Sequence, residues 1–66
     1  MIIVVNGQER QVSEGTRLGE LLDDLRVRVD AVAVAVNLEV VPRRSLRETA
    51  LKPHDRVEVV RAVGGG

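Results

Sequence analysis

The strongest constraint on the fold of this chain is that its apolar residues follow two different periods. Four leucines recur at i, i+3, i+4 and i+7, the spacing that places side chains on one helical face: Leu18, Leu21, Leu22 and Leu25. Residues 31–36 read AVAVAV, and such alternation is typical of a strand because successive side chains point to opposite faces of a sheet. We therefore expect one amphipathic helix that packs on the bulkier valine face of a sheet.

Turn-forming residues divide the first two thirds of the chain. Asn6 and Gly7 follow the run IIVV, and Asn-Gly predicts a tight hairpin because both residues tolerate positive φ. Thr16 is expected to cap the helix, which should extend for about three turns. The segment NLEVV predicts a short strand that ends at Pro42, because proline lacks the N–H that a sheet ladder requires.

The last third predicts a short helical turn over 45–50, a turn at 53–55, and a final strand, RVEVVRAV, that leads into the glycines. The first and last strands should pair in parallel at the centre of the sheet, because both carry near-continuous apolar runs. This order predicts an α+β fold of the β-grasp, ubiquitin-like class, with four to five strands in a mixed sheet and one main helix on one face. We expect the domain to span residues 1–63 and a flexible glycine tail to span 64–66.

The size of the chain makes an apolar core essential. A chain of 66 residues without cysteine cannot be held together by a disulfide or a cysteine-rich zinc site. A domain near this size buries only about 60% of the surface that its unfolded chain exposes, so most apolar residues must serve the core. We expect nine residues in it: Leu18, Leu21, Leu22, Leu25, Val32, Val34, Val36, Val57 and Val59.

Composition argues against two classes of partner. The apolar stretches are far shorter than the roughly 20 residues that cross a bilayer, and the first ten residues show no signal peptide, so the expected location is the cytoplasm, away from membranes. The formal net charge is zero and the aromatic content is 0%, so the chain lacks both a basic field and stacking rings for nucleic acid.

The polar residues offer little conventional chemistry. His54 is the only histidine and belongs to a turn, which leaves no histidine-based metal site and no obvious nucleophile–base pair. Asp23 and Asp24 are adjacent on the helix and are interpreted as its solvated face, not as converging carboxylates. Arg43 and Arg44, with Arg47 nearby, form a basic cluster that is either a solvated loop or a docking site for an acidic partner.

The chain ends in three glycines, Gly64, Gly65 and Gly66. A phosphate-binding loop is not expected here, because such a loop needs glycines between a strand and the start of a helix. Without a Cβ, glycine can pass through a narrow channel, and three extended residues reach about 10 Å. The glycines therefore suggest a stalk that presents a terminal carboxylate to the active site of another enzyme, where attack on the α-phosphate of a nucleoside triphosphate would activate it.

Several segments together resemble the ThiS family, the bacterial sulfur carriers of thiamin biosynthesis: GTRLGELL, VAVAVN, VVPRRSLRETAL and DRVEVVRAVGGG. The resemblance covers essentially the whole chain. It implies that the chain is a protein co-substrate without a bound cofactor, and not itself an enzyme. Gly66 would be adenylated with ATP by a ThiF-like adenylating enzyme and converted to a thiocarboxylate by a sulfur-donating persulfide protein, and thiazole synthase would then use the sulfur. Gly65 would complete the glycine pair.

Two positions depart from the family pattern: Leu46 stands where members often have tryptophan, and His54 where they have glycine before the aspartate. We expect the first departure to bear on a docking surface. Three alternatives remain open: the small subunit of molybdopterin synthase, a carrier for another sulfur-transfer pathway, and a plain interaction module with an inert tail.

Partner docking is expected on the outer face of the central strands, because a rigid surface must aim the glycines. Arg61 should lie beside this face and Gly64 should supply slack, while Arg43 and Arg44 are weaker candidates. The alanine face of 31–36 either accepts a partner or is half exposed without function.

Overall fold

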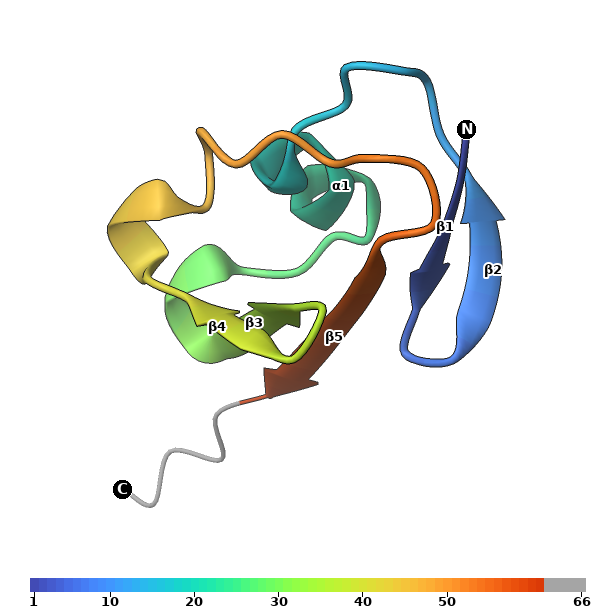
Figure 1. The fold of residues 1–66 in the computed structure, drawn as a ribbon. Coiled ribbons are helices and arrows are strands. Elements are labelled where there is room, and N and C mark those ends of the chain that lie inside the picture. Colours follow the sequence, from blue (N-terminus) through green and yellow to red (C-terminus); the bar gives the residue numbers. More distant parts are fainter. Residues whose placement is uncertain (62–66) are drawn as a thin grey trace.

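The computed structural model describes residues 1–61, which form a five-stranded sheet covered on one side by a helix (Figure 1). The elements in chain order are β1 (Ile2–Val5), β2 (Gln8–Gln11), α1 (Leu18–Asp24), the 3₁₀ turn η1 (Val29–Ala31), β3 (Val32–Val36), β4 (Glu39–Val41), the 3₁₀ turn η2 (Arg43–Ser45) and β5 (Arg56–Arg61). The order in the sheet is β2-β1-β5-β3-β4. β5 pairs in parallel with β1 and antiparallel with β3, as the β-grasp prediction requires. The predicted boundary at residue 63 lies outside the described residues.

The β1–β2 hairpin forms at the predicted turn. Asn6 and Gly7 have φ of 49° and 82°, the left-handed values that an Asn-Gly hairpin turn needs. The two strands differ in burial: Ile3 and Val5 of β1 are buried, whereas all four residues of β2 are exposed. β1 therefore contributes to the core, whereas β2, the polar strand of the hairpin, faces solvent.

The helix α1 begins later and is shorter than predicted. The Thr16 hydroxyl donates to the Ser13 carbonyl at 2.6 Å, and the N-cap is Arg17, whose backbone N–H donates to Glu20 Oε1 at 2.8 Å. The prediction of Thr16 as N-cap is wrong because this residue closes the preceding turn. Two turns later the helix ends where Arg26, with φ of 57°, adopts the left-handed conformation.

The core unites α1 with the helix-facing side of the sheet. Six of the nine predicted members are buried, and the other three, Leu25, Val36 and Val59, are partly buried against them. Four buried residues were absent from the predicted core: Ile3, Val5, Leu46 and Leu51. Leu46 is only 2% exposed, so its side chain belongs to the core and the expectation that it shapes a docking surface is wrong.

The segment between β4 and β5 passes over the start of α1, as its yellow-to-orange ribbon shows (Figure 1). The Leu18 N–H donates to the Thr49 carbonyl at 2.7 Å, and the Leu51 N–H donates to the Thr16 carbonyl at 3.0 Å. Its helical turn, η2, lies at Arg43–Ser45, earlier than the predicted 45–50. A Cβ on Gly19 would lie 3.0 Å from Arg47 Cα, so the close approach of this segment to α1 favours glycine here.

Candidate functional site

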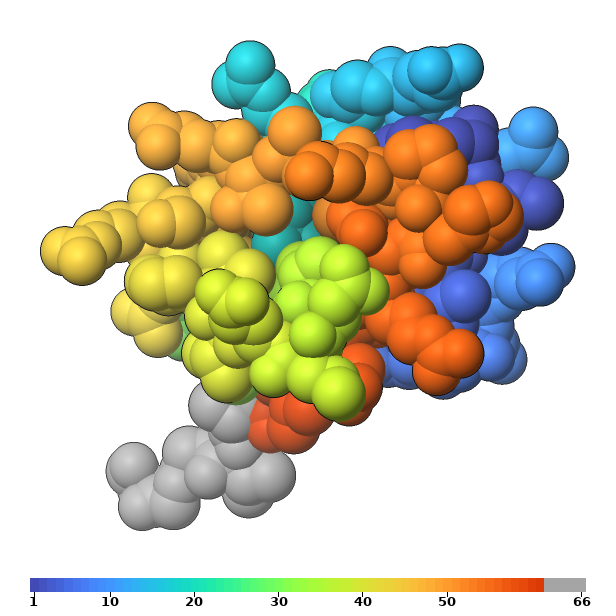
Figure 2. Space-filling view, viewed as in Figure 1, coloured from blue at the N-terminus to red at the C-terminus, as the bar shows by residue number. Residues whose placement is uncertain are grey.

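The C-terminal strand β5 connects the domain to the predicted reactive segment. Gly64, Gly65 and Gly66 lie outside the described residues, so their predicted roles stay predictions. The structure does define where that segment starts: Arg61, the last residue of β5, is paired with Val32 of β3. The β3–β4 hairpin, yellow-green in the space-filling view, lies against the red end of β5 (Figure 2).

The outer face of the sheet carries exposed apolar side chains near the end of β5. Ala33 lies opposite Val60, and Ala35 lies opposite Val40. Val60 is 60% exposed and Val40 is 72% exposed, although both are large apolar residues. We call Ala33, Ala35, Val40 and Val60 the outer apolar surface. Ala33 is exposed and Ala35 half-buried, which leaves the surface open to a partner.

Arg61 lies on the opposite face of the sheet. Side chains alternate along β5, so Arg61 shares the helix-facing side with Val57 and Val59, and its partner Val32 is also on that side. The expectation that Arg61 lies beside the outer apolar surface is therefore wrong. The alternation of valines in RVEVVR already contained this information, because it places residues 57, 59 and 61 on one face.

Arg61 borders a hollow between the end of α1, the β1–β2 hairpin and β5. Its lining includes apolar side chains at the base and charged side chains at the edge: Val27, Val32, Val59, Glu9, Arg10 and Arg61. Arg26 and Arg28 line the adjoining depression together with Arg61. The helix-facing side of the β5 end is thus rich in guanidinium groups, with Glu9 as the acidic exception. We call the part of this side that carries Arg10, Arg26, Arg28 and Arg61 the basic surface.

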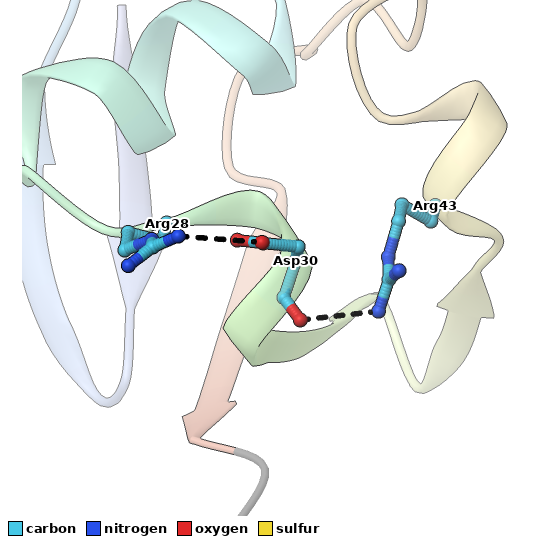
Figure 3. A network of polar contacts seen from close by, with 3 residues as sticks. All are labelled: Arg28, Asp30 and Arg43. Carbon is cyan, nitrogen blue, oxygen red and sulfur yellow. Dashed lines mark hydrogen bonds and ion pairs between the residues drawn. The ribbon is translucent and has the colours of Figure 1, made fainter.

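The other predicted basic cluster is partly engaged within the fold. Arg43 Nη2 donates to the Asp30 carbonyl at 3.2 Å, and Arg28 Nη2 lies 3.5 Å from Asp30 Oδ2 (Figure 3). Arg28 and Asp30 are 82% and 58% exposed, so the ion pair contributes little to stability. Arg43 therefore connects η2 to η1, while Arg44 and Arg47 are exposed.

Three polar side chains hold β5 in place, and the sequence predicted this role for none of them. The carboxylate of Asp55, buried to 9% exposure, accepts hydrogen bonds from Asn37 Nδ2 at 2.9 Å and from the Lys52 N–H at 2.8 Å. Asn37 Oδ1 accepts from the Arg56 N–H, and Asn6 bonds to Val59. The Asn-Gly hairpin signal marks Asn6 in the sequence, but not its hydrogen-bond partner in β5.

The remaining predicted polar residues are where the sequence placed them. His54 is exposed in a turn with φ of 69°, and Asp23 and Asp24 are exposed on α1. The left-handed φ at His54 explains why glycine suits this position in the family pattern. Among residues 1–61, no three His, Cys, Asp or Glu side chains are grouped to hold a metal ion, and no helix is long and apolar enough to span a membrane.

The fold and the site together define a ubiquitin-like β-grasp domain in which the central strand continues into a glycine-rich end. The sequence model of the ThiS family matches residues 3–66. The chain belongs to the ThiS family.

Individual relatives agree with this assignment. A crystal structure of the thiamine biosynthesis protein ThiS from Geobacter metallireducens superimposes with a TM-score of 0.86, at 36% identity and with full coverage of both chains. The sulfur carrier protein ThiS of Escherichia coli is 30% identical over 66 residues, again with full coverage of both. A thiazole synthase of Paramagnetospirillum magneticum is 41% identical over the whole chain, which spans only 20% of that protein.

Proposed function

We propose that this chain is a sulfur carrier of thiamin biosynthesis and that its reactive group is the Gly66 carboxylate. The observation that carries the proposal is the end-to-end similarity to the sulfur carrier protein ThiS of Escherichia coli, which covers all of both chains. The similarity includes the glycine end, because the family model extends to residue 66.

The proposed chemistry has three steps. A carboxylate oxygen of Gly66 attacks the α-phosphorus of ATP in a ThiF-like adenylating enzyme, so that pyrophosphate leaves and an acyl adenylate forms. The terminal sulfur of a protein persulfide then attacks the carbonyl carbon and AMP leaves. A thiol cleaves the sulfur–sulfur bond, which yields the thiocarboxylate and a disulfide. In this proposal the chain contributes the Gly66 carboxylate, acts as the co-substrate of the adenylating enzyme and binds no cofactor of its own.

Thiazole synthase is the proposed acceptor of the sulfur. The thiazole synthase of Paramagnetospirillum magneticum contains a segment similar to this whole chain, which supports a working association between the two kinds of domain. Joining two domains in one chain raises their effective concentration, an advantage when one must deliver a group to the other.

The two surfaces at the end of β5 are the proposed docking sites. Val60 on the outer apolar surface and Arg61 on the basic surface are neighbours in the chain but face opposite sides of the sheet. We assign acidic groups of the adenylating enzyme to the basic surface, because charge complementarity steers encounter and fixes orientation.

Mass spectrometry tests the proposed function directly. Incubation with an adenylating enzyme, ATP and a persulfide donor should exchange one oxygen for sulfur, with the mass change confined to the C-terminal peptide. A chain extended by one residue beyond Gly66 is the control and should stay unmodified. Failure of the parent chain to form an adenylate or a thiocarboxylate would overturn the proposal. Sulfur transfer with a molybdopterin synthase large subunit but not with thiazole synthase would favour the alternative pathway.

Alanine substitution of single glycines should separate their roles. Gly66→Ala and Gly65→Ala should slow adenylation by about 100-fold, because a Cβ misplaces the carboxylate in a narrow channel. Gly64→Ala should cause a smaller loss, since this residue is farther from the reacting carbon. Pyrophosphate exchange measures the rate, and far-UV circular dichroism checks that each variant is folded. If all three variants were adenylated as fast as the parent chain, the proposed role of the glycines would be contradicted.

A further inference from the structure

The end of β5 has strand partners on one side only among the described residues. β1 pairs with β5 at Val4↔Arg56 and Val5↔Val57, and this pairing then stops because the chain turns at Asn6. On the other side, β3 stays paired as far as Val32↔Arg61. From Glu58 onward, the backbone groups of β5 that face β1 therefore need a partner other than a strand.

The side chain of Asn6 provides that partner. The backbone N–H of Asn6 first donates to the Val57 carbonyl at 2.9 Å, which continues the parallel ladder between β1 and β5. Its Oδ1 accepts from the Val59 N–H at 2.8 Å, and its Nδ2 donates to the Val59 carbonyl at 3.3 Å. The carboxamide thus replaces the acceptor and the donor that another strand residue would supply.

Asparagine is well suited to this position. The residue must adopt φ of 49°, which asparagine tolerates better than most residues. It must also present one acceptor and one donor from a short side chain, and the carboxamide carries both. Aspartate would keep the acceptor and lose the donor, while glycine would keep the backbone angle and lose both.

Asn37 is the counterpart at the other end of the strand. It also has a left-handed φ, of 52°, and also directs its carboxamide at β5. Its Oδ1 accepts from the N–H of Arg56, the first residue of β5, at 2.9 Å. Asn37 therefore holds the start of β5, whereas Asn6 holds Val59, two residues before the last residue of the strand.

We propose that Asn6 is a positioning residue for the carrier reaction, which rests on the proposed function. By holding Val59 against the β1–β2 turn, its carboxamide keeps Val59–Arg61 in the plane of the sheet. The last residue of the strand, Arg61, then has a fixed orientation. Glycines restrict direction very little by themselves, so the direction must come from the strand that precedes them.

This role predicts a separation of kinetic constants. Asn6 lines the hollow beside Arg61, but its carboxamide is bonded to Val59. Its loss removes no guanidinium group of the basic surface and no side chain of the outer apolar surface, so the KM for the carrier should change little. Fewer docked complexes would have the carboxylate at the ATP, so kcat should fall. A hydrogen-bonded pair of ordinary strength corresponds to a fall in kcat of about 3- to 10-fold.

The experiment compares Asn6→Gly with the parent chain, with Asn6→Asp and with Asn37→Gly. Asn6→Gly retains a favourable hairpin dipeptide, and Asn37→Gly is the matched control because it removes a carboxamide from β5 at the far end. Adenylation kinetics give kcat and KM, and amide hydrogen exchange by NMR reports on Val59. We expect a lower kcat and faster exchange of the Val59 amide only in Asn6→Gly. Asn6→Asp should retain most of the parent kcat, because aspartate keeps the acceptor for the Val59 N–H.

The inference would be overturned, with the proposed function left intact, by an unchanged kcat in Asn6→Gly or by an equal fall in kcat for Asn37→Gly. A rise in KM at constant kcat would also overturn it, since that would make Asn6 a docking residue. If the parent chain is not adenylated at all, the proposed function fails and the inference fails with it.

Discussion

The two ends of β5 differ in how they are held, although they belong to one strand of six residues. At its start, Val57 has strand partners on both sides, and Arg56 is held between Val4 of β1 and Asn37, while the buried carboxylate of Asp55 holds the Asn37 side chain. At its end, Val60 is exposed on the outer face and Arg61 on the helix-facing side, with β3 as the strand partner. The start of the strand serves stability, and the end leaves surfaces free for partners.

This comparison leads to a general expectation about substitutions. Changes in the core and at the start of β5 should lower the free energy of unfolding, with normal adenylation by the molecules that remain folded. Changes at the end of β5 should lower adenylation with little effect on unfolding. Three substitutions test this separation, in decreasing order of expected effect.

Leu22→Ala should have the largest effect. Leu22 is 0% exposed between α1 and the sheet, and its truncation leaves a cavity that costs about 2–5 kcal/mol of unfolding free energy. Urea unfolding followed by far-UV circular dichroism measures the loss. The control is Asp24→Ala on the solvated side of the same helix, which should change stability by less than about 0.5 kcal/mol. An unfolding curve of Leu22→Ala that overlays the parent curve would contradict the core assignment.

Asp55→Ala should have an intermediate effect at the start of β5. Removal of the carboxylate leaves the Lys52 N–H and Asn37 Nδ2 without their acceptor, which costs about 1–3 kcal/mol of unfolding free energy. Asp30→Ala removes an exposed ion pair instead and should cost less than about 1 kcal/mol. The same urea series compares them, and equal losses would show that the buried network is no stronger than a surface pair.

Arg61→Glu should have the smallest effect on stability and act mainly on the encounter with the adenylating enzyme. Charge reversal on the basic surface should slow adenylation at low salt, and the difference should shrink when salt shortens the Debye length to about 8 Å or less. Arg44→Glu makes the same change of net charge on the exposed turn η2, outside the basic surface, and serves as the control. Rates of Arg61→Glu that match the parent at every salt concentration would remove this surface from docking, and a larger loss in Arg44→Glu would transfer docking to that loop.

Part of the site was visible in the sequence, and part depended on contacts between distant residues. The alternation along RVEVVR predicts the face of the sheet on which Arg61 lies. The dipeptide Asn6-Gly7 predicts a left-handed backbone conformation at Asn6, which the structure shows. The hydrogen bonds of Asn6 to Val59, however, join residues that are 53 positions apart. No local pattern predicts that the β1–β2 turn lies beside the end of β5.

The sequence by itself determined the elements and the fold class, because hydrophobic period and turn chemistry are local properties. The leucine spacing predicted α1, the valine–alanine alternation predicted β3, and Asn-Gly predicted the first hairpin. Only the tertiary structure decided that Leu46 and Leu51 belong to the core, since they lie in a segment without a regular period. It also decided that Thr16 closes a turn while Arg17 caps the helix, because the segment 49–51 pairs with the backbone of residues 16–18 and fixes where the helix begins. Core membership in an irregular segment and the exact start of a helix both depend on contacts with residues far away in the sequence. Local sequence patterns do not show these contacts, because they form only when the chain folds.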